Sequence, residues 1–544
     1  MSQNRRISTI SVPDGNVVDT KRESNMENGK KNYADFETAI AAAGCGKFQY
    51  LLLLAIIPVS WATSIDTGSV AIILPSAECD LRMTFFQKGF LNAIVYLGMV
   101  ASGYIWGYIA DVRGRRVVFI YGYLADGICN VLAGFSQNFW TLVFFKFLSG
   151  FMVSGPHASI VAYASEFFGI QGRGRIALVL GFFVTSGNIV TAVLSWIIIP
   201  QGWSIVLWDG AFVYNSWRMF LSACGVPMVI GAVCLLLFPE SPKFLMSQGR
   251  MEDALEVFRK VYRMNTGNPA EEYPVLHLAN NSGKGNADHD GMIEKKAIFF
   301  KPHLPRLLLV TVMQFGSMYA AHTIRLWQPQ LFAILDNFDG TSYNLTAGYE
   351  PTFCEILDLS TAAGRTSASV AENVTCTDIV VNESVYVSTI IIAFFSGVFL
   401  LSASFAQYIL SHKILLHISY IVAFTSLICM YWSTSTMVTL LLTGLFVGLT
   451  NTTLNTIVAT TVVLFPTSLR AIAVSLVMTV GRIGTISGNL LFPVLLAQGC
   501  LASMIQLACF LLQEDRKQEE SRCASVRGIN LTSVHAQNSD SSDR

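Results

Sequence analysis

The chain has 544 residues, of which 52% are hydrophobic and only 13% are charged, and its formal net charge is +0. Soluble domains usually carry about 25% charged residues, so this composition excludes a protein whose surface mostly faces water. The balanced charge also excludes a basic field that would recruit nucleic acid. Most of the 11 cysteines lie inside apolar runs, which excludes a small disulfide-stapled scaffold.

Residues 1–47 form a polar N-terminal tail, and no secretory signal precedes the first apolar run. A helix crosses the hydrocarbon layer in roughly 20 apolar residues. Such runs occur at 48–74, 88–110, 117–135, 139–163, 176–199, 217–238, 304–332, 385–410, 414–432, 437–464 and 471–496. Because only helices or closed barrels satisfy every backbone group in lipid, these long runs predict an all-α transmembrane fold.

The runs group on either side of a polar stretch. We expect an N-terminal six-helix bundle at 48–238 and a linker with short helices at 239–303. A C-terminal helix bundle is expected at 304–512, followed by a polar tail at 513–544.

The last apolar run, Gly499–Leu512, is short for a twelfth span. It measures roughly 21 Å as a helix, against a hydrocarbon layer of about 30 Å. Three explanations stay open: the helix begins near Pro493, the bilayer thins around it, or the transcript is truncated. If it does not cross, the tail lies outside the cell or in a lumen, although Arg516, Lys517, Arg522 and Arg527 in that tail favour the cytoplasm.

Basic residues flank the runs unevenly, and this asymmetry predicts topology. Arg113, Arg115 and Arg116 follow the second run, Arg173 and Arg175 the fourth, and Lys243, Arg250, Arg259, Lys260 and Arg263 the sixth. By the positive-inside rule we expect these loops and both termini to be cytoplasmic. Apolar residues at helical spacing in 249–264 predict a surface helix on that face.

Residues 333–384 are then expected to lie outside the cell or in a lumen. Three glycosylation acceptors occur there, at Asn344, Asn373 and Asn382. The same loop contains Cys354 and Cys376, which could pair in an oxidising compartment.

After the second run the chain contains Gly107, Asp111, Gly114, Arg115 and Arg116 in the order GxxxDxxGRR. This pattern resembles the loop signature of the major facilitator superfamily. We expect Gly107 to permit close helix approach, Gly114 to permit the turn, and Asp111 to pair with an arginine across the loop.

Further motifs narrow the resemblance. The segment from Pro239 to Leu245, which contains Glu240, is similar to the PESPR motif of the sugar-transporter branch. Glu166 followed by Arg173 looks like the acidic-then-basic pair after the fourth helix. Arg470 ends a stretch that resembles ELFPTxLR, although Val463 replaces the acid.

Residues 74–80, 95–99 and 216–218 resemble the synaptic vesicle glycoprotein 2 family and its insect relatives. The resemblance implies a major facilitator fold of two six-helix bundles that works by alternating access. It also relates the chain to organic cation and organic anion transporters. The loop after the eighth run, 407–413, lacks a second copy of the signature.

Ionisable residues at bilayer depth default to functional hypotheses. Asp66 lies in the first run, Asp126 in the third and Lys146 in the fourth. Asp126 and Lys146 fall at similar depth, so we expect them to pair, either as a structural ion pair or as part of a site. Asp66 is the simplest candidate for proton coupling.

Arg482 lies within the eleventh run, where a cation cannot face lipid. Resemblance to the organic anion transporters, which use an arginine in this helix, favours an anionic or zwitterionic solute; pairing with a carboxylate or a helix end is the alternative. Asn451 and Asn455 of the tenth run and Gln314 of the seventh are candidate solute contacts, although such groups more often join helices.

The sequence contains no P-loop, HExxH or paired CxxC motif, so we expect no enzyme activity, no cofactor and no metal site. Transport of a small organic solute, an organic ion or sugar-like molecule, would then draw on a solute, proton or ion gradient, in the plasma membrane or a vesicle membrane. The alternative is a transporter-like membrane protein without transport activity that acts as a vesicle regulator, receptor or scaffold.

Overall fold

The computed structural model describes residues 33–279, 297–300, 303–338, 349–368, 382–406 and 409–511. Within these residues, 11 helices or helix pairs are long and apolar enough to cross a membrane. The all-α transmembrane prediction is therefore confirmed. The helices of eight or more residues are α2 (Phe36–Ala43), α3 (Lys47–Ser60), α4 (Ala62–Leu81), α5 (Phe85–Arg113), α6 (Arg115–Ala133), α7 (Phe139–Glu166), α8 (Ile170–Ile198), α9 (Ser216–Leu235), α11 (Met251–Thr266), α13 (His303–Asp336), α14 (Phe353–Ala368), α15 (Glu383–Ala406), α16 (His412–Tyr431), α17 (Thr436–Leu464), α18 (Thr467–Leu496) and the last helix, Cys500–Leu511.

The chain divides into two compact units, of which the smaller contains the described residues of Met1–Phe48 and Pro242–Ser282. It holds α2, the short α10 (Pro242–Ser247) and α11, together with a parallel pair of strands, β1 (Tyr33–Ala34) and β4 (His277–Leu278). The helix predicted at 249–264 is present as α11.

The apolar side of α11 is buried within this smaller unit. The rings of Phe258 on α11 and Phe36 on α2 lie 6.0 Å apart. The hydroxyl of Tyr273 donates to the Ala39 carbonyl at 2.6 Å, and Asn265 accepts from the Phe48 amide at 3.0 Å. The amphipathic pattern thus reflects packing against α2.

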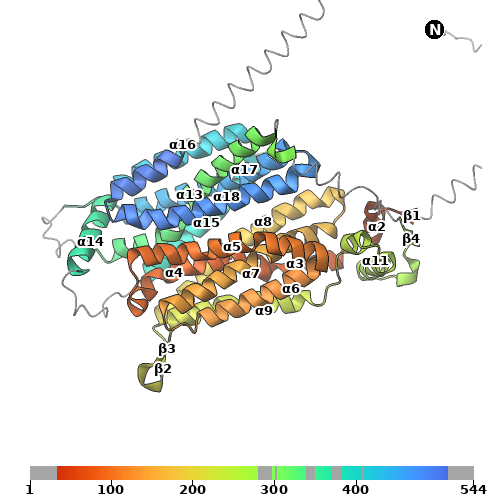
Figure 1. Cartoon of the computed structure of the whole chain (residues 1–544), viewed down its shortest axis with the longest axis horizontal. Helices are drawn as coiled ribbons and strands as arrows, with labels where there is room; N and C mark the ends of the chain where they lie inside the picture. The colour runs from red at the N-terminus through yellow and green to blue at the C-terminus, as the bar shows by residue number, and fades with distance from the viewer. Residues whose placement is uncertain are drawn as a thin grey trace, which may run out of the picture. The chain divides into compact units, whose positions relative to one another are not determined.

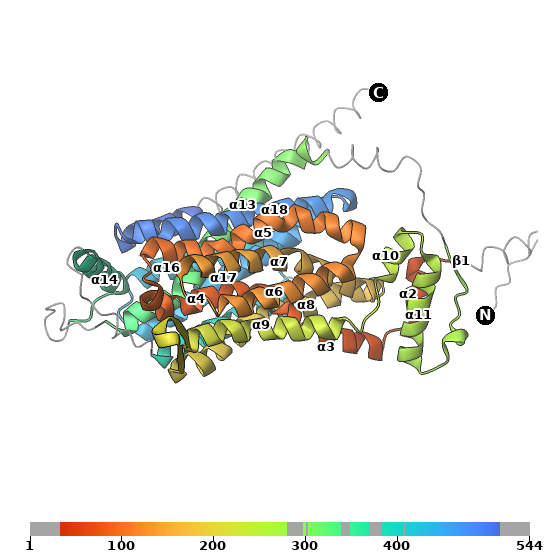
Figure 2. The same ribbon diagram turned by 60° about the horizontal axis from the view of Figure 1, so that its bottom comes forward.

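The larger unit contains the two helix bundles (Figure 1, Figure 2). In the N-terminal bundle α7 packs on α5 and α6, and α6 packs on α9. In the C-terminal bundle α13 packs on α18, and α17 packs on α15 and α16. Contacts of α5 with α18 and of α8 with α15 join the bundles.

The helices alternate in direction, which defines two ends of the bundles. We call the end at which α5 turns into α6 the signature end, and the opposite end the α14 end. An antiparallel hairpin, β2 (Ser204–Leu207) and β3 (Phe212–Asn215), connects α8 to α9, and it lies at the same end as α14 (Figure 1).

Glycines let α5 and α7 approach each other at backbone distance. A Cβ atom added at Gly150 would lie 2.1 Å from the Val95 carbonyl oxygen, and one at Gly98 would lie 2.3 Å from that of Phe147. The hydrophobic effect does not drive helix association within lipid. Close packing of small residues therefore supplies much of the favourable free energy of association.

A disulfide joins Cys354 at the start of α14 to Cys500, with their Cα atoms 5.3 Å apart. The expected Cys354–Cys376 pairing is therefore wrong, and Cys376 itself lies outside the described residues. The residues around Cys354 form a helix, which places it beside the turn after α18. Asp358 on the next turn of α14 accepts a hydrogen bond from the Cys500 amide at 2.6 Å.

The short last apolar run is confirmed as the helix Cys500–Leu511. It begins at the α14 end, because Cys500 is held there by α14 and α18 ends nearby at Leu496. The helix therefore runs back toward the signature end. The expected tail at 513–544 lies outside the described residues.

We predict that non-reducing peptide mapping by mass spectrometry will find a Cys354–Cys500 cross-link. Replacing both cysteines by serine should lower the melting temperature, because a native disulfide that closes a long loop typically contributes ~2–4 kcal/mol. Cys376→Ser is the matched control and should leave the melting temperature unchanged. A cross-linked peptide that pairs Cys354 with Cys376 would contradict the assignment.

Candidate functional site

The N-terminal bundle contains a buried acid–lysine cluster, made of Asp66 and Ser69 on α4, Asp126 and Asn130 on α6, and Lys146 on α7. All five side chains are fully shielded from solvent. The Lys146 ammonium donates to Asn130 Oδ1 at 2.7 Å and to Ser69 Oγ at 3.0 Å. The Asn130 amide donates to Asp66 Oδ1 at 2.7 Å and to Asp126 Oδ1 at 3.1 Å.

The expected direct pair between Asp126 and Lys146 is therefore replaced by a bridge through Asn130. Asn130 lies four residues after Asp126, on the same side of α6, and its amide group occupies the space between the ions. The structure brings Asp66 into the same cluster, which joins three of the predicted site residues.

Each carboxyl group of the cluster retains one oxygen, Asp66 Oδ2 and Asp126 Oδ2, without a hydrogen-bond donor. Two carboxylates and one ammonium would carry one excess negative charge. Buried charge that is not compensated is expensive, so a proton bound between the two carboxyl groups would make the cluster neutral.

A cavity lies between the bundles, bounded by α4 and α8 on one side and α13, α15 and α17 on the other. Its empty volume is about 500 Å³, part of which is open to solvent. Its polar lining comes from Asn188, Thr191, Arg325, Gln328, Thr389 and Ser396. The rest of the lining is glycine, proline and aliphatic side chains, which is typical of sites for small organic molecules.

Side chains tie the bundles together at the α14 end of this cavity. Ser76 and Tyr386 share a hydrogen bond of 2.9 Å, and Gln330 donates to Glu78 at 3.2 Å. A Cβ atom at Gly89 would lie 2.3 Å from the Asn489 carbonyl oxygen, so α5 and α18 touch there. The structure is thus closed at the α14 end.

Two arginines lie at the bundle interface. Arg325 on α13 donates to Asn188 Oδ1 on α8, and Arg482 on α18 donates to Ser154 Oγ on α7 at 3.2 Å. Of these, Arg325 lines the cavity. Arg482, which the sequence predicted as a candidate solute contact, is not among the residues that line this cavity, and its hydrogen bond reaches the other bundle. In the described residues neither guanidinium forms an ion pair with a carboxylate.

The remaining candidate contacts lie beside the cavity and do not line it. Asn451 donates to Ser396 Oγ at 2.7 Å, which places it behind a lining residue. Asn455 donates to the Asn451 carbonyl at 2.8 Å, and Gln314 contacts the Met478 sulfur at 3.6 Å. Asn451 and Gln314 therefore connect neighbouring helices, whereas the hydrogen bond of Asn455 stays within α17.

The motif residues at the signature end form a second network. Arg115 at the start of α6 donates to Glu166 Oε1 at the end of α7, while Ser241 donates to Glu166 Oε2 at 2.5 Å. Glu240 accepts from the backbone amides of Ser241 at 2.9 Å and of Arg116 at 3.2 Å. The two sequence motifs therefore fasten α6, α7 and the end of α9 together.

Two expectations about the signature loop are not met. A Cβ atom at Gly107 would have nothing within 4 Å, so this glycine does not serve close helix packing here. Asp111 is exposed, and among the described side chains it forms no ion pair with an arginine. Gly114 behaves as expected, with φ of +93° at the turn between α5 and α6.

Three other predicted positions can be placed in part. Arg470 lies in the first turns of α18, and its Nε is buried without a hydrogen-bond partner. Arg173 lies on α8, but its side chain is outside the described residues. Asn382 is exposed and donates to Asp336 at 2.6 Å, while Asn344 and Asn373 lie outside the described residues.

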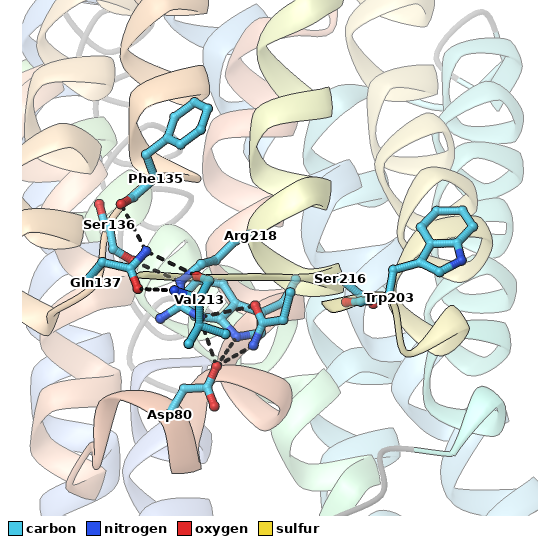
Figure 3. Close-up of polar contacts among 10 residues, drawn as sticks. Asp80, Phe135, Ser136, Gln137, Trp203, Val213, Ser216 and Arg218 are labelled. Carbon is cyan, nitrogen blue, oxygen red and sulfur yellow. Dashed lines mark hydrogen bonds and ion pairs between the residues drawn. The ribbon is translucent and has the colours of Figure 1, made fainter. Parts of the chain in front are cut away.

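A third network, at the α14 end, was not predicted as a site (Figure 3). Asp80 at the end of α4 accepts from Arg218 at 3.0 Å and from the Trp217 indole at 2.8 Å. Arg218 also donates to the Ser136 carbonyl at 2.9 Å, and Gln137 exchanges two hydrogen bonds with Val213 of the hairpin.

The sequence signal for this third network was the resemblance of residues 74–80 and 216–218 to one family. Arg218 holds three loops of the N-terminal bundle at once, which explains why these two distant segments form one feature. The network fixes the loops and does not line the cavity.

Burial raises the pKa of Glu240 above its ordinary value of 4.5, against the opposing hydrogen bonds and the nearby arginines. The folded chain then holds a proton more tightly than the unfolded chain, so this contribution to stability is present at low pH and is lost as pH rises through the folded pKa. We expect the melting temperature of the wild type, relative to Glu240→Gln, to fall as the pH rises above 4.5, the ordinary pKa of this carboxyl group. Glu252→Gln on exposed α11 is the control, and a difference for Glu240→Gln that does not change with pH would contradict the prediction.

Comparison of the sequence with known proteins finds synaptic vesicle glycoproteins as relatives. Synaptic vesicle glycoprotein 2B of Rattus norvegicus is 32% identical over 257 residues, which cover 46% of this chain and 38% of that protein. Synaptic vesicle glycoprotein 2A of Homo sapiens is 31% identical over 270 residues, which cover 49% and 36%. The match thus spans less than half the length of these curated relatives.

Among solved structures, the xylose transporter XylE from E. coli in a partially occluded inward open conformation has a TM-score of 0.60 at 15% identity and covers 87% of this chain and 99% of its own. A D-xylose-proton symporter has a TM-score of 0.61 at 13% identity, with 87% and 97% covered. These likenesses concern the fold. The family model described as Major Facilitator Superfamily matches residues 56–489, which is most of the chain, and the chain therefore belongs to that superfamily.

Proposed function

We propose that this protein is a secondary active transporter that carries a small organic solute across the membrane by alternating access. The observation that carries the proposal is the cavity between the bundles, lined by polar groups from both of them. A solute held there contacts both bundles, so their relative movement changes which end of the cavity is open. The signature end would face the cytoplasm and the α14 end the outside or a lumen.

The buried acid–lysine cluster supports proton coupling in this proposal. Asp66 lies two residues before Gly68, which lines the cavity. Protonation of a carboxyl group in the cluster changes its charge without contact with the solute. A proton on the cluster could therefore favour one of the two bundle arrangements.

The alternative function is a membrane protein that has kept the fold and lost transport. Two observations favour it: the curated relatives are synaptic vesicle glycoproteins, and residues 407–413 contain no acid that could form a counterpart to the signature network. The two functions differ in whether a solute crosses the membrane.

The deciding experiment is counterflow and uptake by the full chain in proteoliposomes, with radiolabelled sugars, organic anions and organic cations. We expect counterflow for at least one class. Folded protein with no flux for any class would support the alternative function instead.

For a solute that is transported, Asp66→Asn should abolish uptake driven by a proton gradient and retain counterflow, because counterflow needs no net proton movement. Glu256→Gln, an exposed carboxylate on α11, is the matched control and should behave as the wild type. Unchanged proton-driven uptake in Asp66→Asn would remove this residue from the coupling.

The open space beside Gly107 gives a second prediction for transport. Closing the signature end would bring another helix toward this part of α5, since α5 already packs on α18 at the α14 end. Gly107→Leu should therefore slow transport at least tenfold while the melting temperature stays unchanged, because the present conformation has room for the side chain. Equal transport rates in the variant and the wild type would show that this face stays open throughout the cycle.

A further inference from the structure

We infer that the cavity binds a solute bearing a carboxylate or a similar anionic group, and that Arg325 is the residue that holds this group. The inference rests on the proposed function in one respect, because it takes the cavity to be the solute site. It goes further by naming the chemical class of the solute and the residue that selects it.

The first observation is the position of Arg325. Its side chain lines the cavity at the interface, and its hydrogen bond is to a neutral amide, Asn188 Oδ1. In the part of the chain that the structure describes, no carboxylate pairs with it. A guanidinium stays charged in proteins and has five donors, so most of its hydrogen-bonding capacity remains available.

The second observation is the chemistry of the other lining groups. Every other polar residue of the lining is a neutral amide or hydroxyl, namely Asn188, Thr191, Gln328, Thr389 and Ser396. Gln328 is also engaged with Thr389, at 3.2 Å. The cavity therefore has a single charged group in its lining, and that charge is positive.

Three buried or half-buried carboxylates of the N-terminal bundle have partners other than Arg325. Asp66 and Asp126 accept from Asn130 in the cluster that contains Lys146. Glu78 forms an ion pair with Lys88 at 2.6 Å. Their placement leaves Arg325 as an uncompensated charge in a site of low polarity.

Arg482 adds to the positive field at the interface. Tyr96 on α5 lies within electrostatic reach of both arginines. The Tyr96 hydroxyl also forms a hydrogen bond of 2.6 Å with His322 Nδ1, and His322 lies three residues before Arg325 on α13. A cation at this depth is costly unless an anion joins it, and a carboxylate solute would supply two acceptor oxygens in the geometry that a guanidinium fits.

The test uses purified full-length chain and two matched pairs of probes, benzoate with benzamide and nicotinate with nicotinamide. Members of a pair have nearly the same shape and differ mainly in charge. We expect both carboxylates to raise the melting temperature of the wild type, since a ligand that binds the folded state stabilises it, and both amides to have a much smaller effect. Competition binding then gives the apparent affinities.

Two variants address Arg325 separately. Arg325→Gln removes the positive charge. Asn188→Asp replaces the side-chain amide that accepts from Arg325 by a carboxylate. Both should weaken carboxylate binding about tenfold or more, the loss that corresponds to one charge-assisted hydrogen bond. Asn188→Asp keeps the guanidinium and adds a partner to it, so it covers the case in which Arg325→Gln fails to fold. Arg250→Gln, which changes an exposed cation just before α11, is the control and should bind as the wild type does.

Equal stabilisation by carboxylates and amides, or no stabilisation by either carboxylate, would overturn the inference. Wild-type affinity for carboxylates in both cavity variants would also overturn it. Failure of the proposed function gives a different result: carboxylates would bind in an Arg325-dependent manner, yet none would cross the proteoliposome membrane. Counterflow of a neutral sugar that is unaffected by Arg325→Gln would keep transport and refute the anion site.

Discussion

The structure depends on the absence of water from the interior of the bilayer. Backbone groups in the spanning segments need hydrogen-bond partners from the protein, which a helix supplies, and each buried ion needs a partner from the protein or from a ligand. Lys146, Asp66 and Asp126 meet this requirement together, through the single amide of Asn130. Arg325 meets it only in part, with the oxygen of Asn188. The ions of the acid–lysine cluster thus have partners from the protein alone, whereas Arg325 keeps hydrogen-bond donors that a solute can use.

The polar groups of the larger unit form separate networks with different structural roles. Glu166, Arg115 and Ser241 fasten helices at the signature end, and Arg218 with Asp80 fastens loops at the α14 end. These two networks hold the N-terminal bundle as a rigid body. Between them lie the acid–lysine cluster and the cavity at the interface between the bundles. Rigid bundles with a polar interface suit a carrier in which one bundle rocks against the other.

The conformation of the structure explains why Gly107 of the signature motif lacks the close helix contact that the sequence predicted. Gly107 has open space around it, whereas Gly89, near the other end of the same helix, touches the backbone of α18. One helix thus has a packed end and a free end in a single state of the molecule. A motif that serves a conformational cycle need not show its contacts in each state of that cycle.

Hydropathy and charge in the sequence determined the spanning helices, the bundle order and the burial of Asp66, Asp126 and Lys146, because lipid acts on each segment locally. Which groups meet depended on packing between segments far apart in the chain. Tertiary structure alone put Asn130 between Asp126 and Lys146, joined Cys354 to Cys500 and turned Arg325 into the cavity. These outcomes follow from helix rotation and close approach, which the period of a single helix does not specify.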